Sequence, residues 1–475
     1  MKNITIRDIE RATEGTLICM KGEEEEGEAA EQRVSDICID SRIIKEGDLF
    51  VPLAGENTDG HRFLPGAMKK AAVAFTSLDP EQLYPTEELM AEAVERGDLL
   101  IRVKDTEKAL QDVGAYIRMQ YEPTVIGVTG SVGKTTTRRM ISTALSSTRE
   151  VYETPGNLNS RYGVPITTSR MLDQPSEVAV LEMGIDRIGE MDILQYVARP
   201  EIAVCTMIGV CHMEYFGTRE VIRSEKLKVA SQDTVLFLNA DDPMLREVKG
   251  HVTAKELYYY GLAGDAEYRA DNLRGDGDGV AFDYCHEEKV IPVRLPVAGD
   301  HNVRNAVVAM AICDYLGMDP EAAAKGLSEF QPMRQLTKRT AGGAVVIDDT
   351  YNASPDSVKA ALKVLSDHAS KGVHWAVLGD MFELGSLEKE LHESVGDAFA
   401  GLNIQRLVTV GTLAKALAAH AKEALPELRV DSFDTLSDAV ALLKNELGSG
   451  DVALLKASHG MHFDEIVKQL TEEEQ

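Results

Sequence analysis

The chain has 475 residues, of which 44% are hydrophobic, and its formal net charge is −28 at pH 7. This length is too great for a single hydrophobic core and predicts about three domains. The negative charge argues against a nucleic-acid partner, because the phosphate backbone of nucleic acids requires a basic protein surface. No apolar run reaches the roughly 18 residues of a membrane span, and residues 1–10 lack the apolar core of a signal peptide, so we expect a cytoplasmic protein without membrane insertion.

The N-terminal part of the chain combines short apolar runs with helical patterns. The apolar runs are typical of strands and cover residues 15–20, 34–39, 49–53, 72–75 and 99–103. Their alternation with helical segments indicates a small α/β domain. A helical stretch at 106–120 leads to Pro123, so we place the first domain boundary after residue 122. The acidic run at 22–31 is interpreted as a solvated loop or hairpin.

Residues 125–137 read Val-Ile-Gly-Val-Thr-Gly-Ser-Val-Gly-Lys-Thr-Thr-Thr, in which an apolar strand breaks into a glycine loop and continues as a helix. Glycines let backbone N–H groups turn toward an anion, the helix N-terminus adds partial positive charge, and Lys134 reaches the outer phosphates. The hydroxyl of Thr135 suits Mg²⁺. A plain glycine-rich turn is the alternative. The predicted ATP or GTP site consists of Thr129, Gly130, Ser131, Val132, Gly133, Lys134, Thr135 and Thr136.

Apolar strands that end in polar residues recur through the central part of the chain. The strand at 178–181 ends in Glu182, the strand at 202–206 is followed by His212, and the strand at 235–238 ends in Asn-Ala-Asp-Asp. Strands that alternate with helices form mostly parallel sheets, whose ligands bind beyond the carboxyl ends of the strands. We therefore expect these polar ends to meet the phosphate loop at one edge of a central domain.

Glu182 is a candidate metal ligand, because a carboxylate beside Thr135 and phosphate oxygens completes the oxygen shell that Mg²⁺ prefers. A solvated loop glutamate is the alternative. His212 is a second candidate because of its place at a neighbouring strand end, although a single histidine is commonly structural. Lys226 follows on a predicted helix, and its spacing alone indicates a surface lysine.

The segment 296–306 places His301, Asn302 and Asn305 in the first turns of an alanine-rich helix. Asparagine offers a paired donor and acceptor that suit a purine edge, so these residues are candidates for nucleotide contact. For Asn302 a plain helix N-cap is the alternative.

The pattern of the central part ends near Pro332, which closes a central domain at residues 123–331. Further strands are predicted at 344–347, 375–378, 407–410 and 452–455, with amphipathic helices at 357–368, 387–402 and 413–425. This is a second doubly wound pattern, without a phosphate loop of its own. We expect a Rossmann-like C-terminal domain over residues 332–475.

Together these segments resemble the Mur ligase family, the ATP-dependent amide-forming enzymes of peptidoglycan precursor synthesis. The family's phosphate loop is matched at 129–135, its Glu-x-Gly element at 182–184, and its Gly-x-His-Asn-x-x-Asn-Ala element around 299–306. The resemblance covers nearly the whole chain. It implies an α/β protein with a UDP-sugar-binding domain, an ATP-binding domain and a Rossmann-like ligase domain, and with ATP and Mg²⁺ as cofactors. We expect it to act as a monomer.

The resemblance also implies which residues contact the ligands. Arg334 and Asp349 stand where the family reaches ATP from the last domain, and they join His301, Asn302 and Asn305 in the implied ATP site. The implied substrate contacts are Ser41, Arg42, Asn157, Asn159, Tyr351, Asn352, Lys456 and Ser458.

Lys226 is implied to be carbamylated, which converts a cation into a carboxylate. The modified side chain would then hold Mg²⁺ together with Thr135, Glu182 and His212. The implied catalytic residues are Lys134, Lys226 and His212.

Within the family, the motifs at 348–355 and 378–385 are most similar to those of the enzymes that add D-alanyl-D-alanine to UDP-N-acetylmuramoyl-tripeptide. The third residue of that peptide is left open. Ser160, Cys211, Lys228 and His459 depart from the family's usual residues, so a related ligase for a different acid and amine is an alternative. A phosphate-loop switch that only hydrolyses nucleotide is the alternative from another class, although a guanine-specific Asn-Lys-x-Asp motif is missing.

Overall fold

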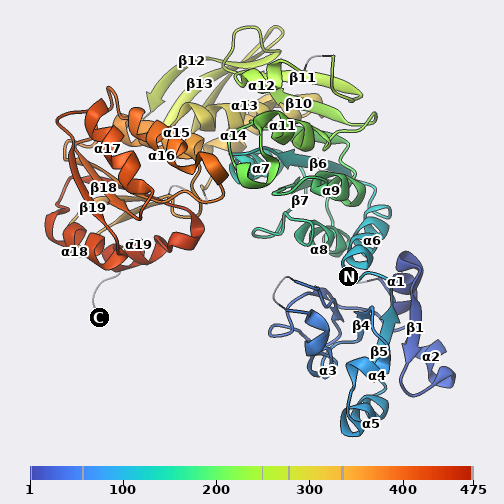
Figure 1. Ribbon diagram of the computed structural model, residues 1–475. Helices are drawn as coiled ribbons and strands as arrows, with labels where there is room; N and C mark the ends of the chain where they lie inside the picture. Colours follow the sequence, from blue (N-terminus) through green and yellow to red (C-terminus); the bar gives the residue numbers. More distant parts are fainter. Residues whose placement is uncertain (2, 56–57, 249, 277–278, 333–335, 472–475) are drawn as a thin grey trace.

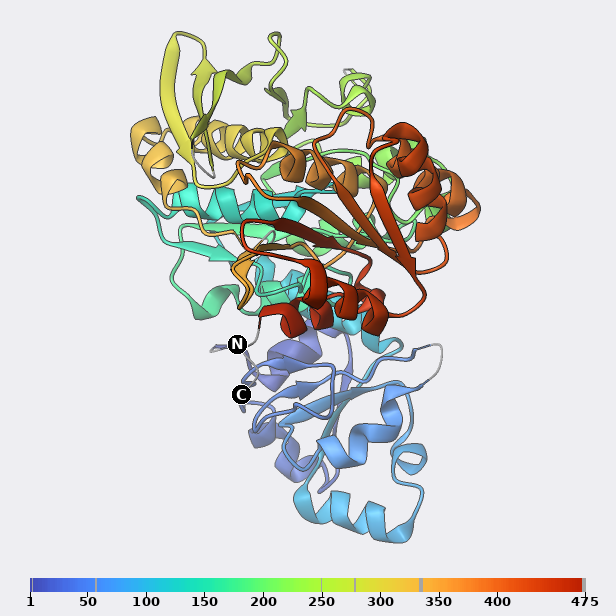
Figure 2. The same cartoon turned by 90° about the vertical axis from the view of Figure 1, so that its left-hand side faces the viewer.

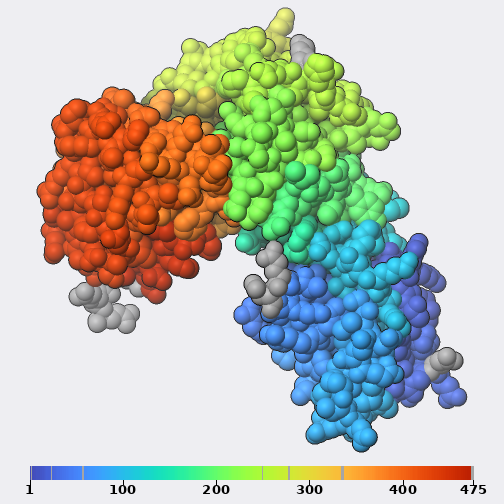
Figure 3. Space-filling model, in the orientation of Figure 1, coloured from blue at the N-terminus to red at the C-terminus, as the bar shows by residue number. Residues whose placement is uncertain are grey.

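The computed structural model describes residue 1 and residues 3–55, 58–248, 250–276, 279–332 and 336–471. Three sheets follow one another along the chain and form three domains arranged as an arch (Figure 1). In the space-filling view, the N-terminal and C-terminal domains lie on either side of an open notch below the central domain (Figure 3). Seen from the side, the C-terminal domain lies across the central domain and the N-terminal domain extends away from both (Figure 2).

The N-terminal domain has a five-stranded sheet in the order β1-β5-β4-β3-β2, parallel except for β1 against β5. All five predicted strands are present. Its strands are β1 Thr16–Cys19, β2 Ile37–Cys38, β3 Leu49–Phe50, β4 Val73–Thr76 and β5 Leu99–Arg102. Its helices are α1 Ile6–Thr13, α2 Glu23–Ala29, α3 Leu64–Ala67, α4 Pro80–Leu83, α5 Glu87–Arg96 and α6 Thr106–Arg118.

The acidic run forms the short helix α2, so the prediction of a loop or hairpin is wrong. Glutamate is a good helix former, and the short helix also packs on β1. The helix lies at the outer side of the N-terminal domain, away from the other two domains (Figure 1).

The central domain has a nine-stranded sheet in the order β14-β13-β12-β11-β10-β9-β6-β8-β7, parallel from β12 to β7. The antiparallel extension β12–β14 was not predicted. Its strands are β6 Thr124–Thr129, β7 Val151–Glu153, β8 Val178–Glu182, β9 Ile202–Cys205, β10 Val235–Asn239, β11 Glu256–Gly261, β12 Tyr268–Asp276, β13 Gly279–His286 and β14 Lys289–Leu295.

Helices cover both faces of the central sheet. One core lies between the sheet and α7, α13 and α14, and a second lies on the face covered by α8, α9 and α11. The helices are α7 Lys134–Leu145, α8 Gly163–Ser169, α9 Glu190–Ala198, α10 Met213–Phe216, α11 Arg219–Leu227, α12 Pro243–Arg246, α13 Asp300–Tyr315 and α14 Pro320–Ser328. The neighbouring strands β10, β9, β6 and β8 therefore bring their polar carboxyl ends to one edge, as predicted.

The C-terminal domain has a six-stranded sheet in the order β15-β16-β20-β17-β18-β19, parallel except for β15. Its strands are β15 Leu336–Arg339, β16 Val345–Asp348, β17 His374–Gly379, β18 Arg406–Val410, β19 Arg429–Phe433 and β20 Val452–Lys456. Its helices are α15 Pro355–Asp367, α16 Glu388–Asp397, α17 Ala414–Ala424, α18 Leu436–Glu446 and α19 Asp464–Thr471. The predicted doubly wound pattern is confirmed.

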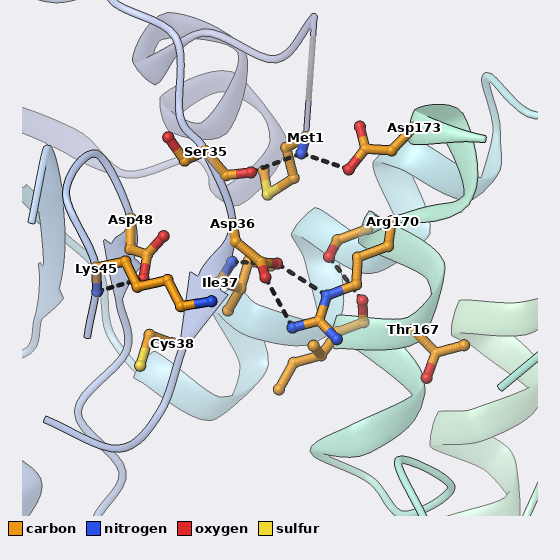
Figure 4. Close-up of polar contacts among 12 residues, drawn as sticks. Met1, Ser35, Asp36, Ile37, Cys38, Lys45, Asp48, Thr167, Arg170 and Asp173 are labelled. Atoms are coloured by element: carbon orange, nitrogen blue, oxygen red, sulfur yellow. Dashed lines mark hydrogen bonds and ion pairs between the residues drawn. The ribbon is translucent and has the colours of Figure 1, made fainter. Parts of the chain in front are cut away.

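Helix α6 connects the first two domains, since its apolar side belongs to the N-terminal core while it also packs on α8 and α9. A polar contact between the domains is drawn in Figure 4. The Asp36 carboxylate accepts hydrogen bonds from Nε of Arg170 at 3.0 Å and from its terminal nitrogen at 2.8 Å. The amine of Met1 donates to the Ser35 carbonyl at 2.7 Å and to Asp173 at 2.8 Å.

None of the helices in the described ranges combines the length and the apolar character that a membrane span requires.

Candidate active site

The phosphate loop has the backbone that its sequence predicts, between the end of β6 and the start of α7. Gly130 has φ 139°, and a Cβ there would lie 1.9 Å from Oγ1 of Thr206, so only glycine fits. Gly133 has φ 89° and caps α7 in the left-handed conformation, which glycine adopts without strain. The loop therefore presents backbone N–H groups and a helix N-terminus to one side.

The side chain of the loop lysine contacts the backbone of its own loop. Nζ of Lys134 donates to the carbonyls of Gly130 at 2.8 Å and Ser131 at 3.3 Å, so its charge lies over the loop. The buried hydroxyls of Thr129 and Ser131 have no hydrogen-bond partner in the part of the chain that the structure describes. A buried hydroxyl without a partner is costly, and an anion in the loop would supply an acceptor to Ser131.

Glu182 lies at the end of β8, directly beside the loop, with its side chain 3% exposed. Its Oε1 accepts hydrogen bonds from Oγ1 of Thr135 at 3.1 Å and from Nδ2 of Asn159 at 2.8 Å. Its Oε2 lies 3.5 Å from Nε of the buried Arg138. The alternative that Glu182 is a solvated loop residue is therefore wrong. The Thr135 hydroxyl and the Glu182 carboxylate lie side by side, as two oxygen ligands of one metal ion would.

A cavity of about 330 Å³ opens on one side of the loop. Of the predicted ATP-site residues, it is lined by Val132, Gly133, Thr135, Thr136, His301, Asn302, Asn305 and Asp349. Asn239, Asp241 and Asp242 from the end of β10 complete this wall. Arg334, the other residue predicted to reach ATP from the C-terminal domain, lies outside the described residues.

The histidine and asparagines of α13 differ in how they are held. Burial lowers the pKa of His301 to about 4, so the ring is neutral near pH 7. Nδ2 of Asn302 donates to the Ala298 carbonyl at 2.7 Å, which ties it to the helix start. Oδ1 of Asn305 accepts from Oγ1 of Thr137 at 3.0 Å, which links α13 to the helix of the phosphate loop.

A second cavity, of about 410 Å³, lies on the other side of the loop, between the central and C-terminal domains. It gathers the loop lysine, the candidate metal ligands and several predicted substrate contacts. The predicted residues that line it are Ser131, Val132, Gly133, Lys134, Thr135, Asn159, Glu182, His212, Tyr351, Asn352, Lys456 and Ser458. Val132, Gly133, Thr135, Ser357 and Lys456 line both cavities.

The C-terminal domain contributes a buried ion pair to the wall shared by the cavities. Nζ of Lys456 lies 2.7 Å from Oδ2 of Asp349, and it also donates to the Asn352 carbonyl at 2.8 Å. Ser458 accepts a hydrogen bond from the backbone of Phe382 at 2.9 Å, which fixes the loop after β17. The charge of Lys456 is therefore compensated by the Asp349 carboxylate.

Lys226 lies inside the protein, 1% exposed, so the prediction of a surface lysine is wrong. It follows the fully buried Ile222 by four residues, which places both on the inner face of α11. Within the described ranges, no hydrogen bond or ion pair is formed by its Nζ. Burial, with the nearby charge of Lys134, lowers the pKa of Lys226 to about 7.

His212 caps α10 with a left-handed backbone, φ 57°. Its Nδ1 lies 2.6 Å from Oε2 of Glu383, a residue of the C-terminal domain that the sequence did not single out. The contact with His212 lowers the pKa of the Glu383 carboxyl. Asp186 and Glu190, which also line the second cavity, were missed too, and no spacing signal marks them.

Three comparisons with known proteins bear on this site. Family models match residues 33–118 (Mur ligase family, catalytic domain), 128–313 (Mur ligase middle domain) and 333–459 (Mur ligase, glutamate ligase domain). The UDP-N-acetylmuramoyl-tripeptide–D-alanyl-D-alanine ligase of Bacillus subtilis is 35% identical over 473 residues, which are 98% of both chains. The chain belongs to the Mur ligase family.

Solved structures agree with this Mur ligase assignment. A crystal structure of MurF from Acinetobacter baumannii matches with a TM-score of 0.83 and 29% identity, and the match covers 99% of both chains. MurF ligase from Thermotoga maritima, solved in complex with ADP, has the same fold, with a TM-score of 0.78 and 23% identity over 92% of this chain and 97% of that one.

The departures from Mur ligase motifs fall at different places in the structure. Cys211 and His459 line the second cavity, and the His459 ring lies 5.9 Å from that of Tyr351. Lys228 instead pairs with Asp192 and Glu225, each at 2.8 Å, on the partly exposed side of α11.

Three of the predicted substrate contacts lie away from the two cavities beside the phosphate loop. Ser41 and Arg42 belong to the N-terminal domain, where Arg42 is exposed and pairs with Asp40 at 2.6 Å. Asn157 is exposed near the start of α8 and, like those two, lines neither of the two cavities described above.

Proposed function

We propose that this chain is an ATP-dependent ligase that joins D-alanyl-D-alanine to UDP-N-acetylmuramoyl-tripeptide in peptidoglycan precursor synthesis. The observation that carries the proposal is a phosphate loop that borders two cavities at once, one lined by candidate nucleotide contacts and one by candidate substrate contacts. A nucleotide in the first cavity would point its terminal phosphate at an acid in the second. The name of the Bacillus subtilis relative, at 35% identity over 98% of the chain, supports the choice of substrates.

The proposed reaction has two steps. A carboxylate oxygen of the tripeptide attacks the γ-phosphorus of ATP, the bond to the β-phosphate oxygen breaks, and an acyl phosphate and ADP form. The amine of D-alanyl-D-alanine, having lost a proton, then attacks the acyl carbon, and the tetrahedral intermediate expels phosphate. Because the carboxylate and phosphates are all anionic, the site acts by positioning and by charge neutralisation. Lys134 and the N–H groups of the loop would position the transferring phosphoryl group and neutralise its charge.

Mg²⁺ fits the residues at this site. Thr135 and Glu182 provide adjacent oxygen ligands, and His212 lines the same cavity. No group of three or more His, Cys, Asp or Glu side chains among the described residues forms a metal centre alone, so phosphate oxygens and a carbamate on Lys226 would complete the shell. The buried, unpaired amine supports carbamylation, since a pKa lowered to about 7 leaves more of the amine in the neutral form that reacts with CO₂. When bound, Mg²⁺ would offset phosphate charge.

Glu182→Gln is expected to reduce activity and to move the Mg²⁺ titration to higher concentration, with a smaller change in the KM for ATP. The substitution keeps the shape of the side chain but removes one anionic ligand. The measurement is ligation rate against Mg²⁺ concentration. Glu153→Gln is the matched control, because Glu153 also pairs with Arg138, at 3.2 Å. An unchanged Mg²⁺ curve for Glu182→Gln would place the metal elsewhere.

The remaining assignments belong to the same proposal. His301, Asn302, Asn305, Arg334 and Asp349 would contact ATP. The proposed domain boundaries lie after residues 122 and 331. Each falls between two sheets, since the first sheet ends at Arg102 and the second begins at Thr124, while the second ends at Leu295 and the third begins at Leu336. We also propose that the enzyme acts as a monomer in the cytoplasm. The substrate contacts would be Ser41, Arg42, Asn157, Asn159, Tyr351, Asn352, Lys456 and Ser458.

A panel of reactions tests the proposed function. Phosphate release from ATP is measured with and without each acid and each amine, and the product is identified by mass. The proposal requires release that depends on both the UDP-linked tripeptide and D-alanyl-D-alanine. Release with neither would indicate a hydrolytic switch, and release only with other pairs would indicate a different ligase.

A further inference from the structure

The loop after β17 contains a residue with no part in the proposed reaction, Glu383. It lines the second cavity, and its carboxylate crosses from the C-terminal domain to Nδ1 of His212 in the central domain, 2.6 Å away. Its carbonyl accepts a hydrogen bond from the backbone N–H of Glu214 at 3.4 Å. One residue of the C-terminal domain thus contacts the start of α10 through both its side chain and its backbone.

The surrounding backbone is shaped for this contact. Glu383 and His212 both have left-handed backbones, with φ 62° and 57°, which non-glycine residues adopt uncommonly. Gly385 has φ 61°, and a Cβ there would lie 3.1 Å from Cα of Glu214, so a side chain would force the two segments apart by a few tenths of an ångström. Two non-glycine residues with left-handed backbones and a closely packed glycine indicate that the two segments are shaped for this contact.

We propose that Glu383 is a positioning residue that orients the imidazole of His212 across the domain boundary. The inference rests on the proposed function, in which His212 faces the bound cation. The ring nitrogen and the carboxylate oxygen form an ion-pair contact at 2.6 Å, but the contact lacks hydrogen-bond geometry, and Nδ1 of His212 has no hydrogen-bond partner among the described residues. Two lone pairs would repel at this distance, so a small rotation of the ring that places a proton between the two atoms is part of the proposal. A neutral ring with its proton on Nδ1 presents Nε2 as the acceptor atom, and a carboxylate partner of this kind fixes the tautomer of a metal-binding histidine.

The position of Glu383 makes this orientation depend on domain docking. The carboxylate belongs to the C-terminal domain, so separation of the domains would release the His212 ring. The chain offers a matched control, the cross-domain ion pair of Lys363 and Asp300 at 3.2 Å, whose side chains are largely exposed. Lys363→Ala removes a contact between the same two domains without touching His212.

The first test is a tautomer measurement on the full chain, without substrates. The chain is labelled with ¹⁵N-histidine, the His212 signal is identified by its loss in His212→Asn, and spectra are recorded at about pH 8, above the ordinary pKa range of histidine side chains. The parent and Lys363→Ala are expected to carry the proton on Nδ1. Glu383→Ala is expected to move it to Nε2, and Glu383→Gln, which keeps an acceptor oxygen, to recover part of the parent signal.

The second test is kinetic. Glu383→Ala is expected to lower kcat by about 10- to 100-fold, as loss of an outer partner of a metal ligand does, with little change in the KM for ATP. In a protein that already carries His212→Asn, adding Glu383→Ala should lower kcat no further. Lys363→Ala should keep a kcat close to that of the parent. The proposal is overturned if the His212 ring of the parent carries its proton on Nε2, or if the reductions in kcat of Glu383→Ala and His212→Asn multiply in the double variant. It is also overturned if Lys363→Ala behaves like Glu383→Ala. A parent that fails to ligate would contradict the proposed function instead, since the tautomer is read without substrates.

Discussion

Lys134→Ala is expected to abolish ligation while leaving the fold intact. Among the described residues, the side chain donates hydrogen bonds to two loop carbonyls, of Gly130 and Ser131, and Lys134 is partly exposed beside the second cavity, so its removal costs the fold little. In the reaction its charge would move from these carbonyls to the transferring phosphoryl group. Loss of one preorganised group of this kind costs about 3 kcal/mol, or about a hundredfold or more in kcat.

The measurement for Lys134→Ala is kcat at saturating ATP, with circular dichroism and the thermal midpoint as checks of folding. Lys325→Ala is the matched control, because Lys325 is an exposed lysine on α14 of the same domain. It should behave like the parent in every measurement. Near-normal turnover of Lys134→Ala at saturating ATP would remove this lysine from the mechanism.

Lys226→Ala is expected to be nearly inactive and to recover part of its activity in acetate. If the carbamate is a direct metal ligand, its loss should exceed the about 10- to 100-fold cost of losing an outer partner. Acetate can enter the vacated space and return a carboxylate to it. The thermal midpoint should stay close to that of the parent, because burying an amine without a partner costs free energy, and its removal offsets the packing lost with the side chain.

Lys228→Ala is the control for Lys226→Ala, since it lies two residues further along the same segment. Lys228 is partly exposed and pairs with Asp192 of α9 and with Glu225 of α11, and a pair of this kind contributes about 1 kcal/mol or less. We expect near-parent activity and no response to acetate. If Lys226→Ala ligated normally, Lys226 would be a buried lysine without a catalytic part.

The sequence was sufficient for features that depend on local pattern. The glycines at 130 and 133, the lysine and the following hydroxyls predict the loop, because phosphate binding needs them in that order. Glu182 could be placed beside Thr135 because parallel strands end at a common edge. The same reasoning predicted that the polar end of β10 meets the phosphate loop, and Asn239, Asp241 and Asp242 do line the first cavity beside that loop.

Features that depend on contacts between distant segments could not be predicted. Lys226 looks exposed because its neighbours in sequence are charged, and only the packing of α11 shows that it faces inward. Glu383 becomes relevant only through His212, on another domain. Strand β12 was missed because only its first half alternates with buried residues, while its second half is mostly exposed and reads as a polar loop.

The step in which a carboxylate oxygen attacks ATP can be tested with an isotope. The terminal carboxylate of UDP-N-acetylmuramoyl-tripeptide is labelled with ¹⁸O, and the phosphate released during ligation to D-alanyl-D-alanine is analysed by mass spectrometry. An acyl phosphate transfers one labelled oxygen from the acid to each phosphate, so we predict singly labelled phosphate in proportion to the amide formed. Phosphate without label, released whether or not amide forms, would contradict the ligase mechanism.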